Sequence, residues 1–239
     1  MKHAPQYEPN TISFVAWPGA GKGTLTDAMI GDLNERDIPF DRCEVGAICR
    51  DHGERQTPFG LLAKDYKDKG LLVPDKHVVP VIADAMRQLR SNVVWLVDGF
   101  PRNGEQVAPY EDLMDELHRD DIILHLKLGR DDKEQDDISA ERMIKRGERA
   151  LSKGQKPRPE DVDPVKRAER LVEARKLLPV IEHFKKIGKI LTIDGTPSSE
   201  IVLAQLRQRL AIRVLETAEL DPDLHAAEMP MPRFTLQPA

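Results

Sequence analysis

Hydrophobic residues along this chain gather in five short runs that are separated by longer amphipathic segments. The runs cover residues 11–17, 39–45, 93–97, 122–128 and 189–193, and most of them are rich in β-branched residues. Continuous apolar runs of this length are typical of strands that are buried on both faces of a parallel sheet. We therefore expect five buried strands.

Between these runs, apolar residues recur every three or four positions, which predicts helices. The clearest example is residues 76–90, where one apolar stripe extends from Val78 to Leu89. Further helices are expected after residue 24, in shorter pieces between 48 and 69, and over 106–118, 132–149, 165–187 (where Pro179 can bend it) and 198–216. Strands that alternate with helices predict an α/β fold with a five-stranded parallel sheet and helices on both faces.

Composition narrows the class of protein. The chain has 239 residues, of which 40% are hydrophobic and 32% charged, and this suffices for one α/β domain with its charges on helix faces. No apolar run approaches the roughly 20 residues that span a bilayer, and the first residues lack a secretory signal. The net charge of −5 argues against a general nucleic-acid binder. We expect a cytoplasmic protein, a monomer that binds neither membranes nor nucleic acids, with Cys43 and Cys49 as free thiols.

The first strand leads into a glycine-rich turn with a lysine at the start of the next helix. Glycines let successive backbone N–H groups converge on one cluster of oxygens, and the helix N-terminus adds partial positive charge. Lys22 adds a full charge at the β- and γ-phosphates, and Thr24 can offer its hydroxyl to phosphate or hydrated Mg²⁺. The alternative is a turn that only caps the helix. The pattern predicts a P-loop NTPase-like fold with an ATP site at Gly19, Ala20, Gly21, Lys22, Gly23 and Thr24.

A second motif, Asp98-Gly99-Phe100-Pro101-Arg102, follows the third strand. Together with the loop at 19–24, it resembles the adenylate kinase family of nucleoside monophosphate kinases, in the form with a short lid. Further matches lie at 46–50, 70–73, 142–147 and 194–197, so the resemblance covers about residues 11–212.

The resemblance implies an AMP site and a donor site. Around AMP, Arg50 and Arg102 would bind the phosphate and Gln106 would read the adenine edge. The same nucleotide would contact Leu71, Leu72, Val73, Gly99, Phe100 and Pro101. On the donor side, Arg142 and Arg146 would bind the ATP base and phosphates, beside Gly195.

The catalytic groups implied by the resemblance are mostly cations. Arg158 and Arg170 would converge on the transferred phosphoryl group, together with Lys22, Arg102 and Arg146. Arg167 competes with Arg170 for this role, because the Arg170 match requires one inserted residue. Asp98 would orient Mg²⁺ through water, with the metal arriving as part of the ATP complex.

Several residues depart from the family pattern or permit plainer interpretations. Ala16 and Gly23 break the strict phosphate-loop pattern, Val45 replaces a usual Thr of the AMP site, and Ala47 replaces a usual Asp. In structural terms alone, Arg142 and Arg146 fit an exposed helix face, and Gln106 fits an ordinary surface position. Asp98 and Arg102 also fit a strand-end cap with a structural ion pair.

The expected organisation is one kinase domain at 11–212 with flexible extensions at 1–10 and 213–239. Within it lie a monophosphate-binding region at 44–73 and a short, metal-free lid at 148–164. The function expected is phosphoryl transfer from ATP to AMP, giving two ADP. A UMP/CMP kinase and a nucleotide-binding regulator with little turnover are the alternatives.

Overall fold

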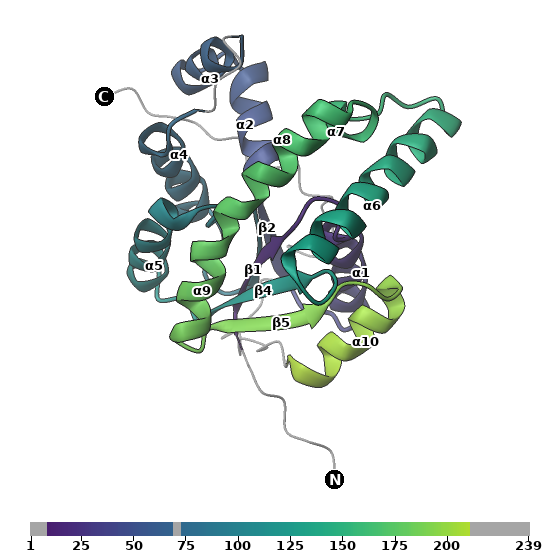
Figure 1. Ribbon diagram of the computed structural model, residues 1–239. Coiled ribbons are helices and arrows are strands. Elements are labelled where there is room, and N and C mark those ends of the chain that lie inside the picture. The colour runs from purple at the N-terminus through teal and green to yellow at the C-terminus, as the bar shows by residue number, and fades with distance from the viewer. Residues whose placement is uncertain (1–8, 69–72, 211–239) are drawn as a thin grey trace.

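The structure is a computed structural model that describes residues 9–68 and 73–210. Leu71 and Leu72 of the expected AMP site lie outside these residues, as do nearly all of the two terminal extensions. The ribbon in Figure 1 shows a central sheet with helices packed around it.

Five parallel strands form the sheet, as the apolar runs predicted. They are β1 (Thr11–Ala16), β2 (Phe40–Glu44), β3 (Val94–Asp98), β4 (Asp121–Lys127) and β5 (Ile190–Asp194), in the spatial order β2-β3-β1-β4-β5. The register pairs Phe14 with Asp98 and Glu44 with Asp98 across neighbouring strands. The carboxyl ends of β1, β2 and β3 therefore meet at one edge of the sheet, where ligands of parallel α/β proteins bind.

The described helices are α1 (Lys22–Glu35), α2 (Val45–Glu54), α3 (Pro58–Asp68), α4 (Asp75–Arg87), α5 (Val107–Glu116), α6 (Asp132–Ser152), α7 (Pro159–Val162), α8 (Pro164–Ala174), α9 (Leu178–Lys186) and α10 (Ser199–Arg209). Two 3₁₀ turns, Gly104–Gln106 and Arg175–Leu177, complete the set.

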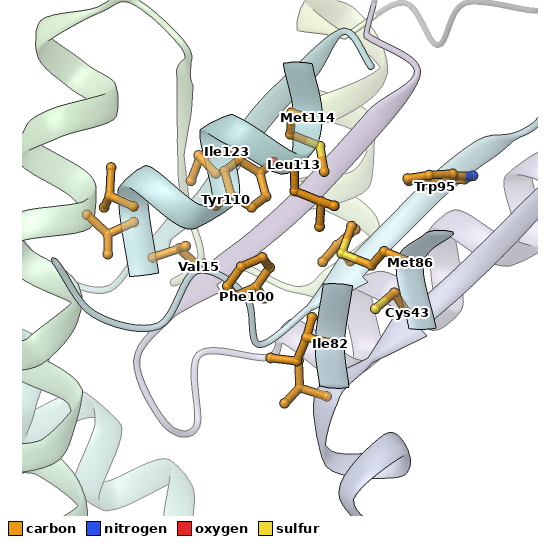
Figure 2. Close-up of a cluster of buried hydrophobic side chains, with 14 of the residues drawn as sticks. Val15, Cys43, Ile82, Met86, Trp95, Phe100, Tyr110, Leu113, Met114 and Ile123 are labelled. Carbon is orange, nitrogen blue, oxygen red and sulfur yellow. The ribbon is translucent and has the colours of Figure 1, made fainter. Parts of the chain in front are cut away.

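Alternating strand residues bury two separate clusters, one on each face of the sheet. Ile12 and Phe14 face α1 and α10, where Leu25, Met29 and Leu206 are buried with them. The other face packs against α4, α5 and α9. Figure 2 shows the second cluster, with Phe100 and Tyr110 in edge-to-face contact at 5.5 Å between ring centroids. Helices on both faces are thus confirmed.

Several predicted helices have different limits in the structure. The helix expected over 76–90 is Asp75–Arg87, and the one expected over 198–216 ends at Arg209. The expected helix over 165–187 is divided into α8 and α9 by the 3₁₀ turn Arg175–Leu177. Pro179 has no N–H to donate to the carbonyl of Arg175, and its ring would collide with that carbonyl, so the break falls just before the proline. Helix α6 continues to Ser152, three residues beyond its expected end. The lid expected at 148–164 therefore begins inside a helix.

Candidate functional site

The phosphate loop is shaped by glycines in the left-handed backbone region. Gly19 has φ +76°, and a Cβ there would lie 3.0 Å from the carbonyl oxygen of Ser139 and 3.1 Å from the Cβ of Arg142. Gly21 has φ +90° and directly precedes α1. Both glycines are required by backbone geometry, and Gly19 also by the close approach of α6.

Helix α6 supports this loop from the side. The hydroxyl of Ser139 donates to the carbonyl of Pro18. Arg142 donates to the carbonyls of Gly195 (2.8 Å) and Thr196 (2.7 Å), which joins α6 to the loop after β5. The alternative of a freely exposed helix face is therefore wrong for Arg142.

Lys22 and Asp98 meet at the carboxyl edge of the sheet. The lysine starts α1 and the aspartate ends β3, and their side chains form an ion pair that is about one-quarter exposed. Glu44 ends β2 in register with Asp98 and also lines the cleft. No group of three or more metal-ligating side chains occurs within 9–68 and 73–210. This donor set fits a metal that is held mainly by phosphate and water.

Three guanidinium groups converge on the cleft without carboxylate partners. Arg102, Arg158 and Arg170 all line it, and none forms an ion pair with another described residue. Burial lowers the pKa of Arg170, and the positive charges of Arg102 and Arg158 lower it further, against smaller opposing effects of Glu160 and Glu173. Cations that repel one another in a cleft form a site for a polyanion.

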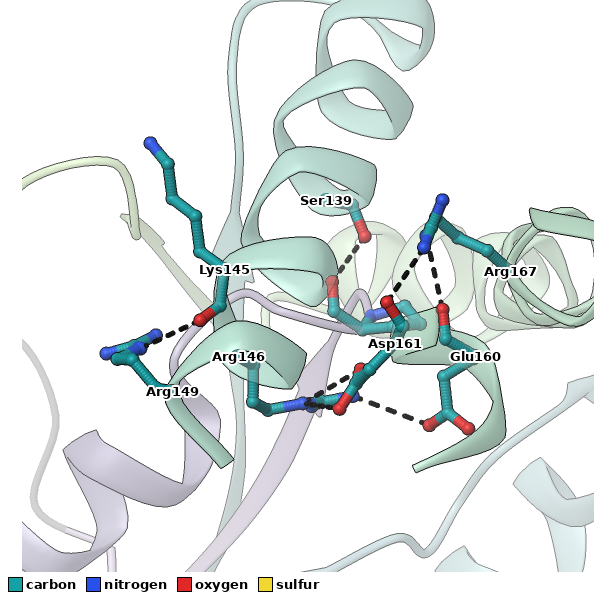
Figure 3. A network of polar contacts seen from close by, with 8 residues as sticks. Ser139, Lys145, Arg146, Arg149, Glu160, Asp161 and Arg167 are labelled. Atoms are coloured by element: carbon teal, nitrogen blue, oxygen red, sulfur yellow. Dashed lines mark hydrogen bonds and ion pairs between the residues drawn. The ribbon is translucent and has the colours of Figure 1, made fainter. Parts of the chain in front are cut away.

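The arm formed by α6, α7 and α8 is held by a compact polar network (Figure 3). Arg146 donates to the buried carboxylate of Asp161 at 2.6 Å and 3.0 Å. Arg167 donates to the backbone carbonyls of Glu160 (3.1 Å) and Asp161 (2.8 Å). The Arg167 guanidinium is thus engaged with the backbone of α7, whereas Arg170 lines the cleft. This difference favours Arg170 as the arginine that would contact the transferred phosphoryl group.

On the acceptor side, Arg50 lines the cleft, with its guanidinium 3.0 Å from the Glu44 carboxylate. Gln106 is 4% exposed. Its carbonyl accepts from the N–H of Arg102 at 2.8 Å, and its amide donates to Asp75 at 2.6 Å. The surface-position alternative for Gln106 is therefore wrong.

The cleft has a volume of about 860 Å³. Most of the residues predicted from sequence line it, namely Gly19, Ala20, Gly21, Lys22, Gly23, Thr24, Arg50, Asp98, Gly99, Pro101, Arg102, Arg142, Arg146, Arg158, Arg170 and Gly195. Phe100 does not, because its ring is fully buried in the core. Val73 and Gln106 are also absent from the lining.

Apart from Asp98, sequence reasoning named none of the acidic residues that line the cleft, which are Asp27, Glu44, Glu160 and Glu173, and it also missed Asp161, which holds Arg146. Glu44 could have been found from its place at the end of a strand beside Asp98. Asp161 had no such signal, because its partner Arg146 lies on another helix, 15 residues earlier in the chain. Three of the residues that depart from the family pattern also line the cleft: Ala16 ends β1, Gly23 lies in the first turn of α1, and Val45 starts α2.

A glycine-rich loop between a strand and a helix, facing converging guanidinium groups, defines a P-loop protein that handles phosphate groups. A model of the family described as Adenylate kinase matches residues 14–189. An adenylate kinase of Thermosynechococcus vestitus is 33% identical, over 81% of this chain and 93% of the relative. Adenylate kinase 1 of a Nostoc species is 30% identical (83% and 97%), and an adenylate kinase of Methanosarcina acetivorans is 29% identical (81% and 95%). The chain belongs to the adenylate kinase family, whose members are phosphotransferases.

Proposed function

We propose that the protein transfers the γ-phosphoryl group of ATP to AMP, giving two ADP. The observation that carries this proposal is the set of guanidinium groups of Arg102, Arg158 and Arg170, which line the same cleft as the phosphate loop and have no ion pair among the described residues. Two bound polyanions that exchange a phosphoryl group need such charges to stabilise the transition state.

The acceptor oxygen requires no general base. The second pKa of a phosphate monoester lies near about 6, so the AMP phosphate is already largely ionised at neutral pH. The protein's task is to hold two nucleotides in line and to screen charge. The loop at 19–24 with Arg142 and Arg146 would hold ATP, whereas Arg50 and Arg102 would hold the AMP phosphate.

Mg²⁺ is proposed as the ion that accompanies ATP. Asp98 would hold it through water, beside the hydroxyl of Thr24, and Ala47 supplies no carboxylate. When bound with ATP, the ion would neutralise part of the charge of the phosphates. The Lys22–Asp98 pair keeps the aspartate at the cleft edge, where its second oxygen can face a hydrated ion.

Acceptor choice is assigned to Gln106. In the structure its amide group is bonded to Asp75, so we propose that the adenine edge takes the place of this partner. Uracil and cytosine cannot reproduce the same pair of donor and acceptor. The Gln106→Ala variant should raise the KM for AMP more than the KM for ATP.

The deciding experiment is a coupled assay of AMP, UMP, CMP and GMP at equal ATP and Mg²⁺. Fastest turnover with AMP supports the proposal, whereas equal rates with UMP would remove the basis for the role of Gln106. A protein that binds ATP but turns over none of the four would be a nucleotide-binding regulator.

The segment 148–164 is proposed as a short mobile lid that contains no Cys or His to bind a metal. Closure would carry Arg158 onto the donor phosphates, so it should depend on bound polyanion. A bisubstrate analogue that links two adenosines should protect this segment from hydrogen exchange much more than it protects α4. Unchanged exchange at saturating analogue would show a passive loop.

Within 9–68 and 73–210, no helix is long and apolar enough to cross a membrane. We propose that the protein acts as a cytoplasmic monomer with ATP and AMP as its small-molecule partners. Light scattering with and without the bisubstrate analogue tests the oligomeric state.

A further inference from the structure

One face of α6 contacts the phosphate loop and the two residues that lead into it, Trp17 and Pro18. Asp136, Ser139 and Arg142 follow one another at intervals of three residues, which places them on the same side of the helix. Asp136 accepts a hydrogen bond from the indole N–H of Trp17, Ser139 donates to the carbonyl of Pro18, and Arg142 lies within 3.5 Å of the carbonyl of Ala20. Ser139 bonds to the segment before the phosphate loop, and Arg142 contacts the phosphate loop and the loop after β5. Asp136, in contrast, has a second partner in another part of the fold.

That second partner is Arg175. The guanidinium of Arg175 donates to Oδ2 of Asp136 at 2.6 Å, while Oδ1 accepts from Trp17 at 3.0 Å. The Asp136 side chain is 17% exposed, and the Trp17 residue is 2% exposed. Both carboxylate oxygens are therefore engaged, one with a buried indole and the other with a guanidinium whose side chain is 54% exposed.

Arg175 lies at the junction between α8 and α9. It starts the 3₁₀ turn that separates α8 from α9, and it follows Arg170 by five residues. In this turn the N–H of Leu178 donates to the carbonyl of Arg175, so a 3₁₀ hydrogen bond takes the place of α-helical bonding between α8 and α9. A side chain that holds Arg175 therefore helps to fix the position of α8 and of the Arg170 guanidinium that α8 carries.

We propose that Asp136 is a positioning residue that sets the distance between the phosphate loop and Arg170. The proposal rests on the proposed function, since both groups must act on one phosphoryl group. Among residues 9–68 and 73–210, no other side chain is hydrogen-bonded both to residues 17–24 and to the 164–177 segment. Groups that act together in a transition state tolerate only small misplacement, so this link should affect the chemical step more than binding.

The test compares Asp136→Asn with Asp137→Asn. The first change keeps an oxygen for Trp17 and removes the charge that holds Arg175, whereas the second removes the neighbouring carboxylate, whose exposed partner is Lys133. We expect Asp136→Asn to lower kcat about 10-fold, with both KM values within about twofold. Asp137→Asn should change neither.

A second readout does not depend on turnover. The chain has two tryptophans, so a ¹H–¹⁵N spectrum contains two indole N–H signals, and the Trp17→Phe variant identifies one of them. Arg175→Met should shift the Trp17 signal although Arg175 touches Asp136 and not Trp17. Lys176→Met, which removes a partner of Glu173, should not shift it. In an Asp136→Ala background, the shift caused by Arg175→Met should disappear.

The outcomes separate the possible failures. An Asp136→Asn variant with a lowered melting temperature and unchanged kcat would show a purely structural role and would overturn the proposal. An unchanged chemical shift of the Trp17 indole N–H in the Arg175→Met variant would overturn the proposal as well. A wild-type protein without turnover on any monophosphate would refute the proposed function, and the indole signals would then decide whether the link between loop and α8 exists.

Discussion

The cations that line the cleft form two sets, which differ in whether they have partners within the protein. Beside the phosphate loop, Lys22 is paired with Asp98, Arg142 is bonded to backbone carbonyls, and Arg146 is held by the buried Asp161. The second set, Arg102, Arg158 and Arg170, has no ion pair with any described residue, and the charges of these arginines repel one another. Protein partners fix the first set in space. The second set keeps its charge available, so phosphate can replace the missing carboxylates.

The strongest test of this contrast is the Lys22→Ala variant. It removes the positive charge nearest the expected β- and γ-phosphates, so phosphoryl transfer should fall by about 10³-fold in a protein that remains folded. A coupled assay and a thermal melt measure the two effects. Lys133→Ala is the matched control, because the Lys133 pair with Asp137 lies outside the cleft. Retention of a tenth of wild-type kcat would show that the loop does not bind the transferred phosphate.

Arg167 and Arg170 lie on the same helix, α8, but only the guanidinium of Arg167 is hydrogen-bonded to other described residues. Arg170→Ala should lower kcat by about 10²-fold or more, with little change in melting temperature, because the guanidinium has no ion pair within 9–68 and 73–210 to lose. Arg167→Ala should lower the melting temperature and leave kcat within about fivefold, since the Arg167 guanidinium bonds only to carbonyls of α7. The reverse result would exchange the assigned roles of the two arginines.

Arg50 is intermediate, because it lines the cleft and also contacts a carboxylate. Glu44 lies 3.0 Å from Arg50 and would repel an incoming phosphate. The Glu44→Gln variant should therefore lower the KM for AMP about threefold, with kcat unchanged within about twofold. Asp51→Asn is the control, because the Asp51 pair with Arg55 lies on the same helix but outside the cleft lining. A rise in KM would show that Glu44 orients Arg50 instead of competing for it.

The smallest effect on activity is expected at His125, which belongs to the framework. Burial lowers the pKa of His125 to about 4, from an ordinary value of 6.5. Because the unfolded chain then binds more protons between pH 6.5 and 4, the free energy of unfolding should fall as the pH drops through this window. The loss should reach about 3 kcal/mol at most. Urea unfolding of His125→Asn should show a flatter profile, and His118→Asn, at an exposed residue, should retain the wild-type profile. An equally steep profile in both variants would contradict this account.

The sequence alone determined the strands, the order of the elements and the phosphate loop. These features follow from local rules. The spacing of apolar residues indicates which face of an element is buried, and glycine indicates a left-handed backbone conformation that other residues rarely adopt. Gly19 and Gly21 stand where the left-handed conformation is needed, and Val94–Asp98 forms a strand because its apolar run has no polar face. The prediction of one helix over 165–187 was wrong because the effect of Pro179 reaches back four residues to the carbonyl of Arg175.

Only the tertiary structure decided which side chains are partners. Phe100 belongs to a motif read as part of the AMP site, but its ring is in the core, because the turn after β3 packs it against Tyr110. Asp161 and Asp136 are ordinary acidic residues in the sequence, and their importance arises because α7 packs Asp161 against Arg146 and α6 carries Asp136 to Trp17. Hydrogen bonds act over about 3 Å, whereas these partners are separated by 15 and 119 residues of chain, so no local pattern can encode them.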